Sequence, residues 1–272
     1  MAKMKVGLVG CGNIGSDLCI ALQKGDIPAE IVALTDVEPA RAEALKREYG
    51  LDSVIGDIES TASRADFIIE CAVAAVVPEV IAAAIRHRRE CLVLSLGALV
   101  NDPTLLETAK ANGVQVRMPS GALCGLDGVR AAREAGLESV TITSTKPPKG
   151  LTGAPYLIAN GIDVESFTTP TVVFEGNALD AVKAFPKNVN VAAALSFAGI
   201  GPERTRVRVV ADPTSNVNSH EIVAEGAFGR LRAVTENVPS PRNPKTSYLA
   251  SLSACAELRA AALAFQSRLQ GF

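Results

Sequence analysis

The sequence contains no tryptophan and only two histidines, three tyrosines and eight phenylalanines. So few aromatic rings argue against a base-stacking platform for single-stranded nucleic acid. The formal net charge of -2 provides no basic field of the kind that attracts nucleic acid. Two histidines also supply few of the imidazole ligands that a zinc site needs. We therefore expect neither a nucleic-acid partner nor a metal.

The six cysteines form no C-x-x-C pair, and most lie in apolar surroundings, so we expect reduced, buried thiols. No apolar run approaches the length needed to span a bilayer. The apolar run near the N-terminus lacks a small-residue cleavage site and has the composition of a strand. We therefore expect a cytoplasmic protein without a membrane partner.

A glycine motif opens the chain. An apolar run over residues 6–9 is followed by Gly10, Gly12 and Gly15 in G-x-G-x-x-G spacing, and then by a helical pattern. In a strand–turn–helix unit, the first glycine permits the tight turn and the second lets the backbone approach a pyrophosphate. The third lets the helix pack closely on the strand. The spacing therefore predicts a dinucleotide-binding loop.

The residues after this loop strengthen the prediction. Asn13 and Ile14 lie at the helix start, where free N–H groups and the helix dipole favour a phosphate. A second strand, residues 31–35, ends in Asp36, at the distance where an acid binds the adenosine ribose. Asp36 favours NAD over NADP, whereas the nearby Arg41 can soften that preference. The alternative is a plain glycine turn with Asp36 capping the next helix.

Strands and helices alternate along the first part of the chain, which is typical of a parallel, doubly wound α/β sheet. The alternation stops near Pro119, and residues 140–145 then alternate like a half-buried antiparallel strand. We expect a Rossmann-type dinucleotide-binding domain over residues 1–118. A substrate, catalytic and dimerisation domain, α+β with an open mixed sheet, should span 119–245. A C-terminal helix, within 246–272, should return to complete the first domain.

Histidine is the side chain whose ordinary pKa best suits acid–base work near neutrality. His87 lies in a charged helix end, which predicts a solvated surface residue. His220 follows a polar loop and begins a strand. Strand alternation places it on the face of Ile222 and Ala224, with Glu221 on the other face. At this point a purely structural role for His220 stays open.

Two other polar side chains are ambiguous. Asn190 lies inside an apolar helical segment, where a polar amide side chain is unusual and needs a structural or functional explanation. Lys245 lies in a proline-containing connector, where it either binds a substrate carboxylate or stays in solvent. The pattern of residues does not separate these alternatives.

Several short segments together resemble the L-aspartate dehydrogenase family, and the resemblance spans nearly the whole chain. The segments are residues 10–15, 95–98, 119–122, 146–148, 185–191, 211–213, 220–222, 237–241 and 243–247. The resemblance implies oxidation of L-aspartate with NAD or NADP to iminoaspartate, and then to oxaloacetate and ammonia. It also implies a link to NAD biosynthesis, since iminoaspartate feeds quinolinate formation, and a homodimer.

By the same resemblance, His220 matches the catalytic histidine of the family. Asn190 matches a cofactor-binding asparagine, and Cys124 occupies a cofactor contact that is usually alanine. We further infer that Lys245 and the backbone near Ser120 and Gly121 meet the two substrate carboxylates.

Two alternatives stay open at this point. One is another two-domain reductase, of the dihydrodipicolinate or homoserine type, and the other is a non-catalytic dinucleotide sensor.

Overall fold

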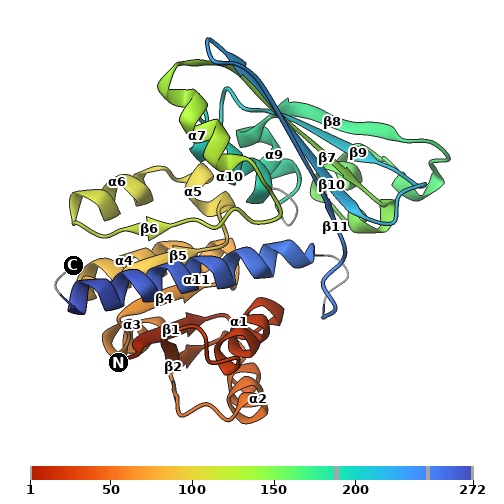
Figure 1. The fold of residues 1–272 in the computed structure, drawn as a ribbon. Helices are drawn as coiled ribbons and strands as arrows, with labels where there is room; N and C mark the ends of the chain where they lie inside the picture. The colour runs from red at the N-terminus through yellow and green to blue at the C-terminus, as the bar shows by residue number, and fades with distance from the viewer. Residues whose placement is uncertain (1, 187–189, 243–245, 271–272) are drawn as a thin grey trace. The chain divides into compact units, whose positions relative to one another are not determined.

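A computed structural model describes residues 2–186, 190–242 and 246–270 of the chain (Figure 1). The chain divides into two compact units. The first comprises Met1–Pro119 and Ser251–Phe272, and the second comprises Ser120–Ala250. Each unit contains one β-sheet.

The first unit contains a six-stranded parallel sheet in the order β3-β2-β1-β4-β5-β6. Its strands are β1 Met4–Val9, β2 Ala29–Thr35, β3 Val54–Ile55, β4 Phe67–Glu70, β5 Glu90–Val93 and β6 Val116–Arg117. This order is that of the doubly wound dinucleotide-binding fold, so the predicted Rossmann-type sheet is confirmed. All four residues of β4 are buried, as expected for a central parallel strand.

Helices pack on this sheet and link its strands. They are α1 Asn13–Gln23, α2 Pro39–Tyr49, α3 Ile58–Arg64, the 3₁₀ turn η1 Ala74–Val76, α4 Val77–His87, α5 Gly97–Asn101, α6 Thr104–Ala111 and α11 Tyr248–Leu269. The core joins Leu8, Phe67 and Ile69 from the sheet to Ala254 and Leu258 from α11. Figure 1 shows the course of α11 along this sheet. The C-terminal helix thus contributes to the core of the first unit.

By length and composition alone, α11 is long and apolar enough to cross a membrane. The expectation that no segment approaches such a length was therefore wrong. The apolar residues on one side of α11 instead pack in the core of the first unit. Its buried apolar residues are Ala254, Leu258, Ala261 and Ala262, at helical spacing. On the exposed side, Arg259 forms an ion pair with Asp26 at 2.7 Å.

The second unit contains a five-stranded sheet in the order β11-β10-β7-β9-β8. Its strands are β7 Leu137–Lys146, β8 Thr171–Asn177, β9 Arg206–Ala211, β10 Asn218–Gly226 and β11 Gly229–Asn237. β7 and β9 are parallel and the other pairs are antiparallel, so the sheet is mixed, as predicted.

Short helices complete the second unit. They are α7 Leu126–Glu134, the 3₁₀ turns η2 Pro148–Gly150 and η3 Val164–Ser166, α8 Pro155–Ala159, α9 Ala178–Ala184 and α10 Asn190–Ala198. The segment 147–170, which connects β7 to β8, contains η2, α8 and η3. One cause is an aromatic cluster, in which Tyr156 of α8 packs on Phe174 and Phe185 at ring distances of 5.3 and 5.7 Å.

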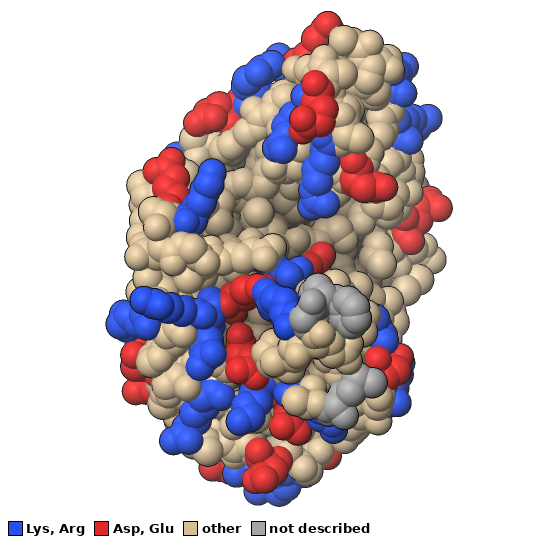
Figure 2. Space-filling model, turned by 60° about the vertical axis from the view of Figure 1, so that its left-hand side comes forward, with Lys and Arg blue, Asp and Glu red and all other residues tan. Residues whose placement is uncertain are grey.

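Lysine and arginine are intermixed with aspartate and glutamate on the face shown in Figure 2. This mixture agrees with the small formal net charge of -2. The visible face therefore has no large area of one sign.

Candidate active site

The glycine loop between β1 and α1 has a different environment at each glycine. Gly10 has a φ of +104°, and a Cβ there would lie 2.7 Å from backbone atoms of Cys71 and Ala72. A Cβ on Gly15 would lie 2.8 Å from the Gly10 carbonyl oxygen, whereas a Cβ on Gly12 would meet no described atom within 4 Å. Glycine is thus required at Gly10 and Gly15 by close packing. The open space at Gly12 fits the approach of a phosphate group.

The N-terminus of α1 is suited to an anion. Gly12 is its N-cap, so no described side chain caps the helix, and its first turn contains no acidic residue. Gly12 and Asn13 are exposed, while Ile14 is half-buried. The first N–H groups of a helix have no partner inside the helix and carry its positive dipole end. The loop therefore fits a dinucleotide pyrophosphate.

Asp36, just after β2, is joined to this loop. Its carboxylate accepts hydrogen bonds from the N–H of Cys11 at 2.8 Å and of Glu38 at 2.9 Å. The alternative in which Asp36 caps the next helix is wrong, because the N-cap of α2 is Glu38. Arg41 is paired with Glu38 at 2.8 Å. The Asp36 carboxylate is therefore held beside the glycine loop, where a ribose would lie.

Sequence reasoning missed a buried acid in the first unit, Glu70 at the end of β4. Its carboxylate accepts hydrogen bonds from the N–H groups of Ala72, Leu94 and Ser95 and from the Ser95 hydroxyl, at 2.8 to 3.1 Å. Burial raises the pKa of Glu70, and these hydrogen bonds oppose the rise. Glu70 thus ties together the segments that follow β4 and β5. The only sequence signal was an acid ending an apolar run.

In the second unit, His220 lies on β10 and is 3% exposed. Ser144 is directly opposite on β7, and its hydroxyl oxygen lies 2.9 Å from His220 Nδ1. Ile222 and Ala224 share the buried face, while Glu221 binds Arg232 on the other side of the sheet. The alternation predicted for this strand is confirmed. The Ser144 contact fixes the orientation of the imidazole ring.

Lys146, at the end of β7, shares the buried face with His220 and Ser144 and is 6% exposed. Burial lowers the pKa of Lys146 to about 8. Burial, together with the positive charge of Lys146, lowers the pKa of His220 to about 3. At neutral pH the face therefore combines a positive lysine with a neutral imidazole, which is the form that can accept a proton.

The segment after Pro119 is held next to this face. The Ala122 carbonyl accepts hydrogen bonds from the Thr235 hydroxyl at 2.8 Å and from the Asn237 amide at 3.2 Å. Thr235 lies directly opposite His220 in the pairing of β10 with β11. The neighbouring Gly121 is therefore held near the strand that carries His220.

Other predicted residues of the second unit lie close to this segment. Cys124 is exposed, and its thiol contacts the Val234 carbonyl at 3.6 Å. A Cβ on Gly121 would lie 3.9 Å from the Val191 side chain, which follows Asn190 at the start of α10. The structure thus gathers the segment 120–124, the start of α10 and His220 in one region of the second unit.

The two remaining residues singled out in the sequence are Lys245 and His87. Lys245 falls outside the described residues. His87, at the end of α4, has a side chain 27% exposed, and its Nε2 lies 2.7 Å from a Glu59 carboxylate oxygen. It therefore has a partner on α3 and is less solvated than expected.

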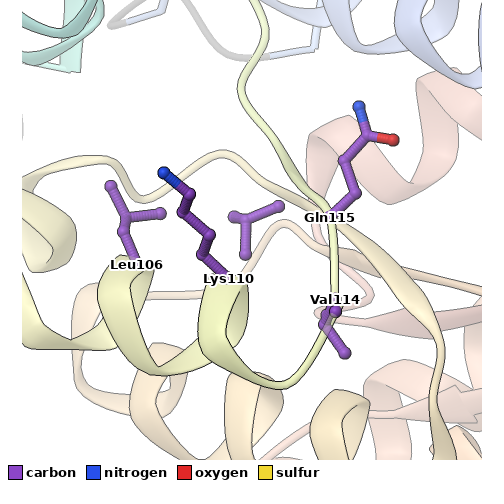
Figure 3. Close-up of a pocket in the computed structure, with 6 residues that line it drawn as sticks. Leu106, Lys110, Val114 and Gln115 are labelled. Atoms are coloured by element: carbon purple, nitrogen blue, oxygen red, sulfur yellow. The ribbon is translucent and has the colours of Figure 1, made fainter.

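A surface pocket of about 390 Å³ lies between α6 and β6 in the first unit. Figure 3 shows Leu106 and Lys110 on α6 beside this opening, with Val114 and Gln115 on the following segment. Its lining contains one charged residue, Lys110, and none of the predicted site residues. We assign it no role in the chemistry.

The doubly wound sheet with its open glycine loop places this chain among the dinucleotide-binding proteins of the Rossmann type. Residues 10–119 match the NAD-binding domain model of homoserine dehydrogenase, and residues 127–261 match the model of the aspartate dehydrogenase C-terminal region.

Two relatives and one crystal structure agree with the match to aspartate dehydrogenase. L-aspartate dehydrogenase from Methanosarcina mazei is 45% identical over 260 residues, which cover 94% of this chain and 96% of the relative. The enzyme from Bradyrhizobium diazoefficiens is 38% identical over 259 residues, covering 95% and 91%. A crystal structure of aspartate dehydrogenase from Thermotoga maritima superposes with a TM-score of 0.72 at 27% identity, covering 95% of this chain and 96% of that one.

The chain belongs to the aspartate dehydrogenase family. The predicted resemblance, enzyme class and NAD(P) cofactor are confirmed. The homoserine-type match is confined to the NAD-binding part, whereas the second unit, which carries His220, matches aspartate dehydrogenase.

Proposed function

We propose that this chain catalyses the reversible NAD(P)-dependent oxidative deamination of L-aspartate to iminoaspartate, which water converts to oxaloacetate and ammonia. The observation that carries the proposal is the buried face of β7 and β10 in a member of this family. There, a neutral His220 is oriented by Ser144 beside a positive Lys146. In the cell, iminoaspartate formed here would supply NAD biosynthesis.

A dinucleotide held by the glycine loop and Asp36 would supply the hydride acceptor for Cα of aspartate. The protein must then manage the water that adds to the imine. When the His220 proton is on Nδ1 and is donated to the Ser144 hydroxyl, Nε2 keeps a lone pair that can accept a proton from that water. In the amination direction the same nitrogen returns the proton.

We assign the dinucleotide to the first unit, through Gly10, Gly12, Gly15, the N–H groups of Asn13 and Ile14, and Asp36. From the second unit, we propose Cys124 and Asn190 as further cofactor contacts. The backbone at Ser120 and Gly121, with Lys245 from outside the described residues, would receive substrate carboxylates. We also propose a homodimer formed through the second unit, which a mass measurement in solution tests.

The test is turnover by the purified protein. With NADH or NADPH, oxaloacetate and ammonium, we expect consumption of reduced cofactor that depends on all three reactants. Parallel assays replace oxaloacetate with aspartate semialdehyde or with the imine substrate of dihydrodipicolinate-type reductases. Faster turnover in a parallel assay would favour another two-domain reductase. Tight NADH binding without turnover in any assay would favour the sensor.

A further inference from the structure

We propose that Glu70 is a positioning residue for the dinucleotide, because its carboxylate holds the segments after β4 and β5 in the conformation that binds the cofactor. This role rests on the proposed function, in which the first unit binds the dinucleotide, and adds a residue to it. The Glu70 side chain is 0% exposed. Burying a charged group is costly, and apolar side chains of similar volume often give equal or greater stability. An acid at this position therefore calls for a reason beyond the packing of the core.

Glu70 lies where the strand order of the first sheet reverses. The chain runs from β1 outward to β2 and β3, then returns to β4 on the other side of β1 and continues to β5 and β6. In open α/β sheets, ligands bind at the carboxyl ends of the strands where the order reverses. Glu70 is the last residue of β4, opposite Val9 of β1 and Val93 of β5. It therefore lies at the edge of the sheet where the dinucleotide is expected.

The segment that follows Glu70 packs against the glycine loop. One oxygen of the Glu70 carboxylate accepts a hydrogen bond from the N–H of Ala72 at 2.8 Å. A Cβ on Gly10 would lie 2.7 Å from that same nitrogen atom, and the Cys71 thiol lies 3.1 Å from the Gly10 carbonyl oxygen. The peptide that Glu70 holds thus lies directly behind the first glycine of the loop. Because protein interiors are closely packed, a shift of this peptide would also shift the loop.

The carboxylate also holds the segment after β5. Its other oxygen accepts hydrogen bonds from the N–H groups of Leu94 and Ser95, at 3.1 and 2.9 Å, and the Ser95 hydroxyl donates to the first oxygen at 2.8 Å. Residues 72–75, Ala-Val-Ala-Ala, are apolar and exposed, and Val73 is 59% exposed. Ligand sites combine apolar walls with a few placed polar groups. Glu70 thus sets the position of an apolar wall next to the glycine loop.

The test is the dissociation constant of NADH for Glu70→Gln, measured by fluorescence titration. Glutamine has nearly the same size, but an NH2 group replaces one carboxylate oxygen, and this group cannot accept a hydrogen bond from a backbone N–H. At least one of the two segments is therefore released in the free protein, and NADH binding must restore it. We expect NADH to bind about tenfold more weakly, since an unsatisfied buried donor corresponds to roughly a 5- to 150-fold change in an equilibrium constant.

The matched control is Glu90→Gln, the same chemical change at the opposite end of the neighbouring strand. Glu90 begins β5 and is paired with Arg117 at 3.2 Å. This variant loses an ion pair in the same unit without touching the carboxyl edge of the sheet, so its NADH dissociation constant should stay within about twofold of the wild type. The melting temperatures show how much stability each variant has lost. A purely structural role for Glu70 predicts unchanged NADH affinity in the folded variant, and that result would overturn the proposal.

A second variant tests whether the effect passes through Glu70. Ser95→Ala removes one of the four hydrogen bonds and keeps the carboxylate. It should weaken NADH binding by about threefold. The effect should be smaller in the Glu70→Gln background, because members of one hydrogen-bond network are coupled. Additive effects of the two substitutions would contradict the proposal.

Two further outcomes are separable. If Glu70→Gln does not fold, Ser95→Ala decides alone, and an NADH dissociation constant equal to that of the wild type would overturn the role of Glu70. A wild type that does not bind NADH refutes the proposed function itself. NADH binding that is equal in the wild type and in folded Glu70→Gln refutes only the positioning role.

Discussion

Each unit buries a charged side chain, and the two are held in different ways. In the first unit, the Glu70 carboxylate accepts four hydrogen bonds, three from backbone N–H groups and one from Ser95. In the second unit, Lys146 lies beside His220, and its charge lowers the pKa of that histidine. The acid is bound by segments that follow two strands, whereas the lysine acts electrostatically on a titratable neighbour.

The difference separates two uses of a buried charge. A carboxylate whose oxygens are all occupied by the fold fixes backbone segments and has little capacity left for a ligand. A cation next to a neutral base perturbs its proton affinity, which is typical of sites that perform chemistry. We therefore expect substitutions at Glu70 to reduce stability and substitutions at His220 to reduce turnover.

The largest effect is expected for His220→Ala. Loss of a general acid–base group should lower kcat by about a hundredfold or more. NADH binding should barely change, because the glycine loop and Asp36 belong to the first unit. A fall in kcat and kcat/KM with little change in KM indicates a group that acts in the transition state.

The control is His87→Ala, the other histidine, which should retain kcat within about twofold. Near-normal turnover by folded His220→Ala would remove this residue from the mechanism. NADH binding by stopped flow and the melting temperature, both measured on the same preparation of His220→Ala, distinguish a catalytic defect from a structural one.

A smaller effect is expected for Glu70→Ala, in the free energy of unfolding. The hydrogen-bond donors of Ala72 and Ser95 would lose their acceptor, which costs about 1 kcal/mol or more for each donor. Removal of the buried carboxylate charge offsets part of this cost. We expect a net loss of about 2 kcal/mol, measured by urea unfolding. Glu43→Ala, an exposed helical control, should change stability by less than about 0.5 kcal/mol. Equal stability of the two variants would show that Glu70 does not anchor the fold.

Next in size is the cofactor ratio in Asp36→Ser. Removing the carboxylate removes its repulsion of a 2′-phosphate, so efficiency with NADP relative to NAD should rise by about tenfold. Asp36→Asn, which keeps an acceptor for the N–H of Cys11, separates the charge from the hydrogen bond. An unchanged ratio of kcat/KM for the two cofactors in both variants would show that Asp36 does not reach the ribose.

The smallest expected effect is the contribution of His220 to the pH dependence of the free energy of unfolding. The pKa of His220 is about 3 in the fold, against an ordinary value near 6.5, so the unfolded chain binds the proton first. The stabilisation is complete above pH 6.5 and is lost progressively as the pH falls from 6.5 towards 3. At pH 5.5 the loss should be about 1 kcal/mol relative to pH 7.5. His220→Gln should lack this component, and an identical pH dependence in both proteins would contradict the burial of a neutral ring.

The strand–glycine turn–helix unit, the alternation of strands and helices in the doubly wound sheet, and the C-terminal helix were predictable because each has a local pattern of adjacent residues. Glu70 was not, since two of its partners, Leu94 and Ser95, follow β5 and only the sheet brings them close to it. Ser144 and His220 are 76 residues apart in the sequence, so their pairing is a property of the β7–β10 register. Lys146 lies in one of the segments that resemble the family, but only the β7–β10 register shows that its charge lies close to His220.

The most direct test of the catalytic face uses the unmodified protein, because it contains only two histidines. Side-chain ¹⁵N NMR spectra of the NADH complex are recorded while succinate is added. We expect the His220 ring to give the signals of a neutral imidazole from pH 8 to pH 5 without ligand, and to shift on binding. The His87 signals should stay in place. A shift of His87 alone, or a saturating ligand that leaves His220 unchanged, would contradict the assignment of this face to the substrate.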